Sequence, residues 1–134
     1  VLWLLESNRQ APANLRREAE KRGVDSSRLI FAPRLPLPDH LARHQLADLF
    51  LDTHPYNAHT TAVDALTAGL PVVTHLGGAL ASRVAGSVLT AAGFPELVAQ
   101  DLQGYEALAL GFANDPDKLE ITRGRLGSLG PRPL

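Results

Sequence analysis

The hydrophobic residues of this chain form short continuous runs, and longer stretches with helical spacing separate these runs. Continuous apolar runs predict strands that are buried on both faces, because a half-buried strand alternates apolar and polar residues. The predicted strands are 1–5, 29–32, 49–51, 72–74 and a short edge strand at 96–99. Between them, apolar residues recur three or four positions apart, which predicts amphipathic helices. The predicted helices are 14–22, 39–45, 79–92 and 102–114, one that begins at His59-Thr60-Thr61, and one from Asp115 to about residue 126.

Glycine and proline residues mark where the predicted elements end. Three prolines within 33–38 predict a loop, because proline lacks the backbone N–H group and restricts the residue before it. Gly69-Leu70-Pro71 is expected to end the helix before the fourth strand. Asp115 followed by Pro116 predicts a helix start, since Asp accepts hydrogen bonds from the first N–H groups and Pro fits the first helical position.

The alternation of strands and helices predicts an α/β fold, a Rossmann-like parallel sheet with helices on both faces. We expect one domain over residues 1–128 and a tail at 129–134. In such sheets ligands bind at the carboxyl ends of the strands. The loops 33–43, 52–61 and 75–82 follow strands there, and we expect them to line one cleft.

Composition narrows the classes of protein to consider. With 134 residues, 45 % of them apolar, the chain can form a folded domain. Its net charge of −1 gives no electrostatic reason to expect nucleic acid or a membrane as a partner. Without cysteine, disulfides and thiolate metal sites are excluded and a cytoplasmic location is favoured. No apolar stretch reaches the roughly 18–20 residues of a membrane span.

The first candidate site is the segment His59-Thr60-Thr61, at the predicted start of a helix. Its side-chain donors and the unbonded N–H groups of a helix start favour a phosphate. The alternative is an ordinary helix cap. Asp64 follows one turn later on the same side, where it could accept a hydrogen bond from a ribose hydroxyl or simply complement the helix dipole.

Three further groups of residues are weaker candidates. His40 and Arg43 share one face of a short helix, where planar side chains could stack on a nucleobase or form an ordinary solvated face. His40 and His44 have a spacing that can hold zinc, but no third ligand lies at a convincing spacing nearby. Gly77-Gly78 before Ala81-Ser82-Arg83 predicts either a second helix start that favours an anion or an ordinary loop.

Several segments, taken together, resemble the O-linked N-acetylglucosamine transferase family, glycosyltransferase family 41, including its SPINDLY-like and bacterial members. The most specific are Asn57-Ala58-His59-Thr60-Thr61 and Ala81-Ser82-Arg83-Val84-Ala85. The resemblance runs in order from residue 1 to about 125. Its segments are 1–5, 28–33, 45–53, 57–74 and 80–87.

The resemblance implies a fold, an activity and a set of contacts. The family has a GT-B fold of two Rossmann-like halves, often behind tetratricopeptide (TPR) repeats, and transfers N-acetylglucosamine from UDP-GlcNAc to Ser or Thr hydroxyls of proteins. Some relatives use GDP-fucose. This chain resembles the C-terminal, nucleotide-binding half. By resemblance, His40 and Arg43 bind the uracil, His59, Thr60 and Thr61 the diphosphate and sugar, and Asp64 the ribose.

The expected protein is therefore an inverting glycosyltransferase that uses a UDP-sugar and a protein acceptor, with no cofactor and no metal. Two departures from the family weaken the predicted site. Leu37 stands where family members carry a Lys near the ribose, and the family's Gln and Lys at the pyrophosphate precede Val1. The chain starts within a predicted strand, so we expect a longer protein with an N-terminal half and TPR repeats, and these residues alone to be inactive. The alternative is a non-catalytic Rossmann-like module that binds a sugar nucleotide or another protein.

Overall fold

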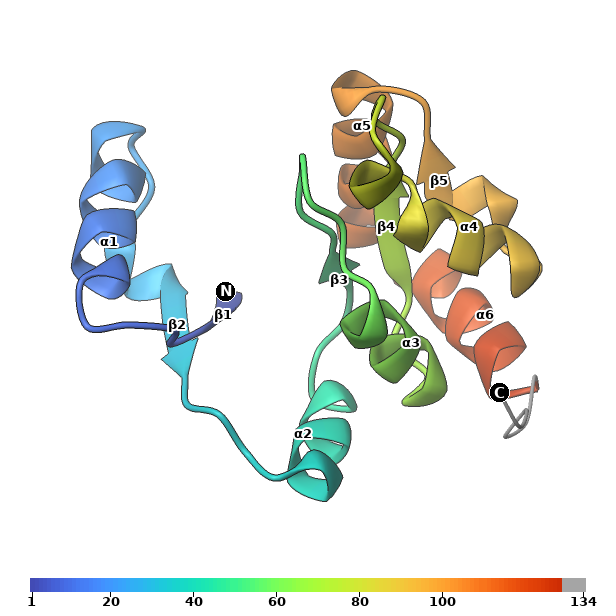
Figure 1. Ribbon diagram of the computed structural model, residues 1–134, viewed down its shortest axis with the longest axis horizontal. Helices are drawn as coiled ribbons and strands as arrows, with labels where there is room; N and C mark the ends of the chain where they lie inside the picture. The colour runs from blue at the N-terminus through green and yellow to red at the C-terminus, as the bar shows by residue number, and fades with distance from the viewer. Residues whose placement is uncertain (129–134) are drawn as a thin grey trace. The chain divides into compact units, whose positions relative to one another are not determined.

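The computed structural model describes residues 1–128 and divides into two units. The first unit is Val1–His40, and the second begins at Leu41 and contains all later elements. The boundary falls inside helix α2 (Leu37–His44). Figure 1 shows the elements of both units, which are described separately below.

The first unit is a strand–helix–strand arrangement. Strands β1 (Leu2–Leu5) and β2 (Leu29–Ala32) pair in parallel, with Leu2 opposite Leu29. Helix α1 (Ala11–Lys21) and the short 3₁₀ helix η1 (Ser26–Arg28) connect them. The predicted strands are confirmed. Helix α1 begins three residues earlier than predicted, because Asn8 Oδ1 accepts from the N–H groups of Gln10 and Ala11 at 3.0 and 2.8 Å.

The second unit contains a three-stranded parallel sheet in the order β3-β4-β5. Its strands are β3 (Phe50–Leu51), β4 (Val72–His75) and β5 (Val98–Ala99). Its α-helices from residue 60 onward are α3 (Thr60–Thr67), α4 (Val84–Ala91), α5 (Leu102–Asn114) and α6 (Pro116–Gly127). Two 3₁₀ helices, η2 (Leu80–Ser82) and η3 (Pro95–Leu97), flank α4.

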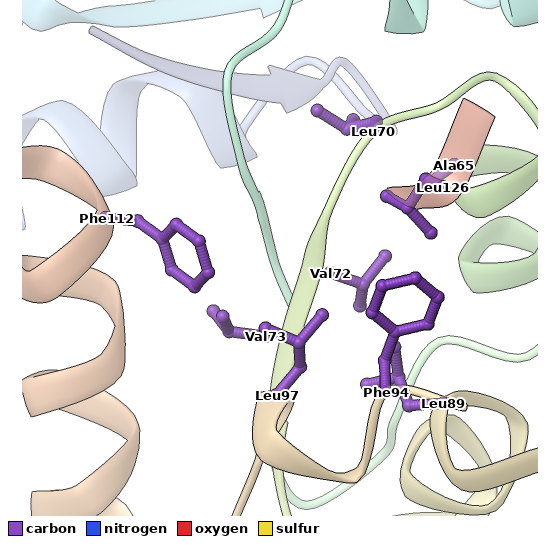
Figure 2. Close-up of a cluster of buried hydrophobic side chains, with 9 residues drawn as sticks. All are labelled: Ala65, Leu70, Val72, Val73, Leu89, Phe94, Leu97, Phe112 and Leu126. Carbon is purple, nitrogen blue, oxygen red and sulfur yellow. The ribbon is translucent and has the colours of Figure 1, made fainter. Parts of the chain in front are cut away.

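The core of the second unit is built around β4, all four residues of which are buried. Helices α3, α4 and α5 all pack against this strand. Figure 2 shows Phe112 of α5 on one side of β4 and Phe94 and Leu89 on the other. Burial on both faces explains why Val72-Val73 reads as a continuous apolar run. The α/β class with helices on both faces of a parallel sheet is confirmed for this unit.

Aspartates cap two helices of this unit, and the cap at Asp115 was predicted. Asp115 accepts from the N–H group of Lys118 at 3.0 Å, and Pro116 is the first residue of α6. Asp101 caps α5 in the same way, with Oδ1 2.7 Å from the N atom of Gly104. Each carboxylate satisfies an N–H group that the helix itself leaves unbonded.

Three predictions about the elements need correction. Strand pairing forms two parallel sheets, β1-β2 and β3-β4-β5, where one was predicted. The predicted loop at 33–38 ends earlier, because α2 begins at Leu37 and accommodates Pro38 in its first turn, where no intrahelical N–H bond is lost. The predicted helix 79–92 is broken into η2 and α4.

The break between η2 and α4 has a local cause. The Ser82 hydroxyl donates to the Ala79 carbonyl at 2.8 Å and lies 3.1 Å from the Ala79 N atom. These bonds close a tight turn at the point where an α-helix would have continued. The predicted tail, 129–134, lies outside the described residues. Within the described residues, no helix combines the length and apolar character that crossing a membrane requires.

Candidate functional site

The candidate site lies where the chain leaves β3 and enters α3. A hollow of about 500 Å³ opens there. It is lined by Phe50, Asp52, Thr53, Tyr56, Asn57, Ala58, His59, Thr60 and Thr61. The three residues predicted to contact a diphosphate are among these lining residues, which all come from one continuous segment of the chain.

The start of α3 faces this hollow with donors. His59 is the N-cap residue, and its carbonyl accepts from the N–H groups of Ala62 and Val63 at 3.1 and 3.4 Å. Within residues 1–128, no hydrogen bond uses the N–H groups of Thr60 and Thr61, and no acidic residue lies in the first turn. Two N–H groups, two hydroxyls and the positive end of the helix dipole therefore remain available for an anion.

Asp52 organises the loop before α3, a role that the sequence analysis did not predict. Its side chain is only 6 % exposed. Oδ1 accepts from the N–H groups of Thr53 and Ala58 at 2.8 and 2.7 Å, and Oδ2 accepts from the Thr74 hydroxyl at 2.6 Å. A buried carboxylate is tolerated when its oxygens are bonded in this way.

Tyr105 joins the same cluster from α5. Its hydroxyl donates to the main-chain carbonyl of Asp52 at 2.9 Å. Burial, with the negative charge of Asp52 as a smaller cause, raises the pKa of Tyr105 to about 12. The hydroxyl therefore remains a donor throughout the physiological pH range.

Asn57 connects the two loops of the second unit that follow β3 and β4. Its N–H group donates to the Ala81 carbonyl at 2.8 Å, and its side-chain amide donates to the Thr53 carbonyl at 2.9 Å. The residue is 2 % exposed, and its Oδ1 has no hydrogen-bond partner in the described part of the chain. The predicted loops 52–61 and 75–82 thus lie together.

Aromatic rings form two groups at the loop. The exposed ring of Tyr56 stacks on His59, with centroids 4.9 Å apart and planes 14° from parallel. Beneath it, His59 Nε2 is buried and, among the described residues, without a partner. In the second group, the ring centroids of His54 and the buried His75 lie 4.4 Å apart, and His75 meets Tyr105 edge-on at 5.4 Å.

The other residues predicted to bind the nucleotide, Asp64, His40 and Arg43, do not line the hollow. Asp64 is half-buried on α3, one turn beyond Thr60 and Thr61, and does not line the hollow. His40 belongs to the first unit and Arg43 to the second, although α2 carries both. Their predicted contact with a base, and that of Asp64 with a ribose, remain predictions.

One weaker candidate, the glycine pair before η2, has a structural explanation. A Cβ atom on Gly77 would lie 2.2 Å from Ser82 Oγ and 2.9 Å from His54 Cε1, so this glycine makes room for its neighbours. The close approach therefore serves packing of the 75–82 loop. Within residues 1–128, no group of three or more His, Cys, Asp or Glu residues could hold a metal ion, so His40 and His44 have no third ligand there.

A parallel sheet whose strand leads through a loop into a helix N-terminus with available N–H groups is typical of α/β domains that bind phosphorylated ligands. The family model for Glycosyl transferase family 41 matches residues 1–129, and the chain belongs to this family.

Sequence similarity to known proteins agrees with this family assignment. The chain is 42 % identical over 126 residues to a UDP-N-acetylglucosamine–peptide N-acetylglucosaminyltransferase of Caenorhabditis elegans, covering 94 % of this chain and 11 % of that protein. It is 39 % identical over 111 residues to a probable such enzyme, SPINDLY, of Hordeum vulgare, covering 82 % and 12 %.

A solved structure, the K341M mutant of the Thermobaculum terrenum O-GlcNAc transferase, matches with a TM-score of 0.90 and 36 % identity. It covers 95 % of this chain, which spans 25 % of that one. The predicted family and the predicted fold class are therefore confirmed. The chain spans only about a tenth of the length of the curated relatives described here.

Proposed function

We propose that this chain is the donor-binding part of a protein O-GlcNAc transferase that is inverting and acts on Ser and Thr hydroxyls. The observation that carries the proposal is the hollow at the start of α3, with its available N–H groups and hydroxyls. These groups suit the diphosphate of a UDP-sugar. The relatives, which are named as N-acetylglucosaminyltransferases, support UDP-GlcNAc as the donor.

In the proposed reaction, the hydroxyl oxygen of a protein acceptor forms a bond to the anomeric carbon of the sugar. The bond from that carbon to the diphosphate breaks, UDP leaves with the electron pair, and the hydroxyl proton passes to a base expected from the other half of the protein. The negative charge that develops on UDP needs stabilisation in the transition state. Thr60 and Thr61 offer main-chain N–H groups and hydroxyls for that charge, so we propose that no metal and no other cofactor is required.

The proposed protein has further parts and partners. A protein acceptor must reach the sugar, and groups that act on the acceptor hydroxyl are expected from an N-terminal Rossmann-like half, preceded by TPR repeats. The near-neutral charge of this chain supports neither a nucleic acid nor a membrane as a partner. The absence of cysteine fits a cytoplasmic protein.

A titration of the full-length protein with UDP tests the donor site and its independence of metal. We expect UDP to bind equally well with EDTA and with added Mg²⁺ or Mn²⁺, because helix N–H groups and hydroxyls replace the ion. Binding that appears only with a metal would refute the metal-free mechanism. Binding of UDP and UDP-GlcNAc without any transfer to protein would favour a non-catalytic binding module.

Substitutions at the helix start locate the nucleotide. Thr60→Ala and Thr61→Ala each remove one hydroxyl from the hollow, so we expect UDP to bind about 3–10-fold more weakly, the effect of roughly one hydrogen bond. Thr67→Ala is the matched control, because Thr67 is an exposed threonine at the other end of the same helix. Equal affinities for all three variants would place the diphosphate elsewhere.

The base contact has its own test. His40→Ala and Arg43→Ala are expected to weaken binding of UDP, because both residues would contact the uracil. Both variants should stay folded, because the two side chains lie on a polar helix face. Arg17→Ala is the control, since Arg17 lies on α1 and donates to the exposed Asn14 side chain at 2.9 Å. If both α2 variants bind UDP as tightly as the parent, the base does not lie at this helix.

A further inference from the structure

The hydrogen bonds of Asp52 tie together both ends of the loop that forms the hollow. One oxygen of its carboxylate accepts from the N–H groups of Thr53 and Ala58, the first and the last residue of the segment 53–58. A single acceptor thereby closes a six-residue loop. Since both bonds involve an ionised oxygen, each is stronger than a bond between neutral groups.

The same residue attaches the closed loop to two neighbouring elements. Its second oxygen accepts from the Thr74 hydroxyl in β4, and its main-chain carbonyl accepts from the Tyr105 hydroxyl in α5. Asp52 is 6 % exposed and Thr74 is fully buried, so water does not compete for the bond between their side chains. These two bonds attach the loop to the central strand β4 and to helix α5. The start of α3 follows directly after the loop.

A carboxylate beside a proposed diphosphate site needs an explanation, because its charge would repel the ligand. Asp52 already accepts three hydrogen bonds from the protein through its two oxygens. Those donors partly neutralise the charge. They also hold the two oxygens towards the loop and towards β4, so the oxygens do not serve as ligand contacts. The carboxylate therefore has the properties of a support for other groups.

We infer that Asp52 is a positioning residue for donor binding, an inference that rests on the proposed function. Its carboxylate fixes the segment 53–58 so that the N–H groups and hydroxyls of Thr60 and Thr61 point into the hollow. Asp52 acts on the nucleotide only through these groups. Asp101 provides a comparison, because it accepts a similar bond from the Gly104 N–H group but does not line the hollow.

Three variants of the full-length protein test this role: Asp52→Ala, Asp52→Asn and Asp101→Ala. For Asp52→Ala we expect UDP affinity to fall about tenfold or more, the effect of losing bonds to a charged group. Asp52→Asn should stay within about threefold, because its oxygen can accept from both N–H groups and its amide can donate to the Thr74 hydroxyl. Asp101→Ala should reduce thermal stability and leave UDP affinity unchanged.

Amide hydrogen exchange without any ligand gives an independent reading. In Asp52→Ala, exchange at Ala58 and Thr53 should accelerate about tenfold or more relative to the parent, because their acceptor is gone. In Asp101→Ala these two amides should exchange as in the parent. If the parent fails to bind UDP, the proposed function is wrong, and the exchange rates alone decide whether Asp52 holds the loop.

The inference fails if Asp52→Ala leaves the exchange of Ala58 unchanged, or if it weakens UDP binding no more than Asp101→Ala does. It also fails if Asp52→Asn is as defective as Asp52→Ala, since charge and not geometry would then matter. Should Asp52→Ala not fold, Thr74→Val removes only one of the three bonds. We then expect UDP binding and Ala58 protection to decrease about threefold, and unchanged values would overturn the inference.

Discussion

Tyr105 and Asp52 show how one residue pair links distant parts of the chain. The Tyr105 hydroxyl reaches the Asp52 carbonyl across 53 positions of sequence. Burial and the Asp52 charge raise the Tyr105 pKa to about 12 from its ordinary value of 10.0. A proton bound more tightly in the folded than in the unfolded state makes stability depend on pH.

This linkage gives a prediction for alkaline pH. The contribution of the Tyr105 proton to the free energy of unfolding is complete below pH 10 and is lost as the pH rises towards about 12. Urea unfolding of the parent should therefore show a falling midpoint in this range, and Tyr105→Phe should lack that component of the fall. Tyr56→Phe retains Tyr105 and should behave as the parent does. Identical pH profiles for Tyr105→Phe and the parent would contradict the prediction.

Substitution of Asp64 can distinguish a contact with the ligand from a structural role in α3. If it accepts from the ribose, Asp64→Ala in the full-length protein should reduce transfer by the equivalent of about 1.5–3 kcal/mol, typical of hydrogen bonds to charged groups. Asp117→Ala is the control, because Asp117 lies in the first turn of α6 and complements its dipole. Initial rates at low UDP-GlcNAc measure the effect, and full activity of Asp64→Ala would assign it to helix stabilisation.

At the scale of elements, the 75–82 loop depends on one glycine. A Cβ atom on Gly77 would overlap Ser82 Oγ and lie 2.9 Å from His54 Cε1, whereas one on Gly78 would meet nothing within 4 Å. The two neighbouring glycines therefore differ in the space available for a side chain.

Gly77→Ala is expected to destabilise the protein by about 1–3 kcal/mol, the usual cost of overpacking. Gly78→Ala, with open space, is its matched control and should change the free energy of unfolding by less than about 1 kcal/mol. Chemical denaturation of both variants measures the difference. Equal stability of the two variants would mean that the loop rearranges without cost.

At the scale of the molecule, the donor site should need more than these residues. The chain spans about a tenth of the length of its curated relatives, and by resemblance Leu37 stands in place of a Lys near the ribose. Each lost charged contact costs about 1.5–3 kcal/mol, so residues 1–134 alone should bind UDP with a Kd weaker than about 0.1 mM. Calorimetry on this chain and on the full-length protein gives the comparison, and submicromolar binding by the chain alone would contradict it.

The local sequence was sufficient to predict most elements. The apolar run at Val72-Val73, the Asp115-Pro116 helix start and the helix 102–114 all appear as predicted. Hydrophobic periodicity and capping depend on residues within one or two turns, so a single segment carries the signal. The segment His59-Thr60-Thr61 was recognisable as a helix start for the same reason.

Tertiary structure decided how these elements support the site. Nothing near Asp52 in sequence indicates that its carboxylate bonds Thr74, 22 positions away, or that Tyr105 donates to its carbonyl. An Asp after a strand is equally compatible with a ligand contact, because only the distances between strand, loop and helix determine which donors reach it. The sequence by itself determined the family, the order of elements and the residues at the helix start. Packing around β4 determined which side chains hold that helix start in place.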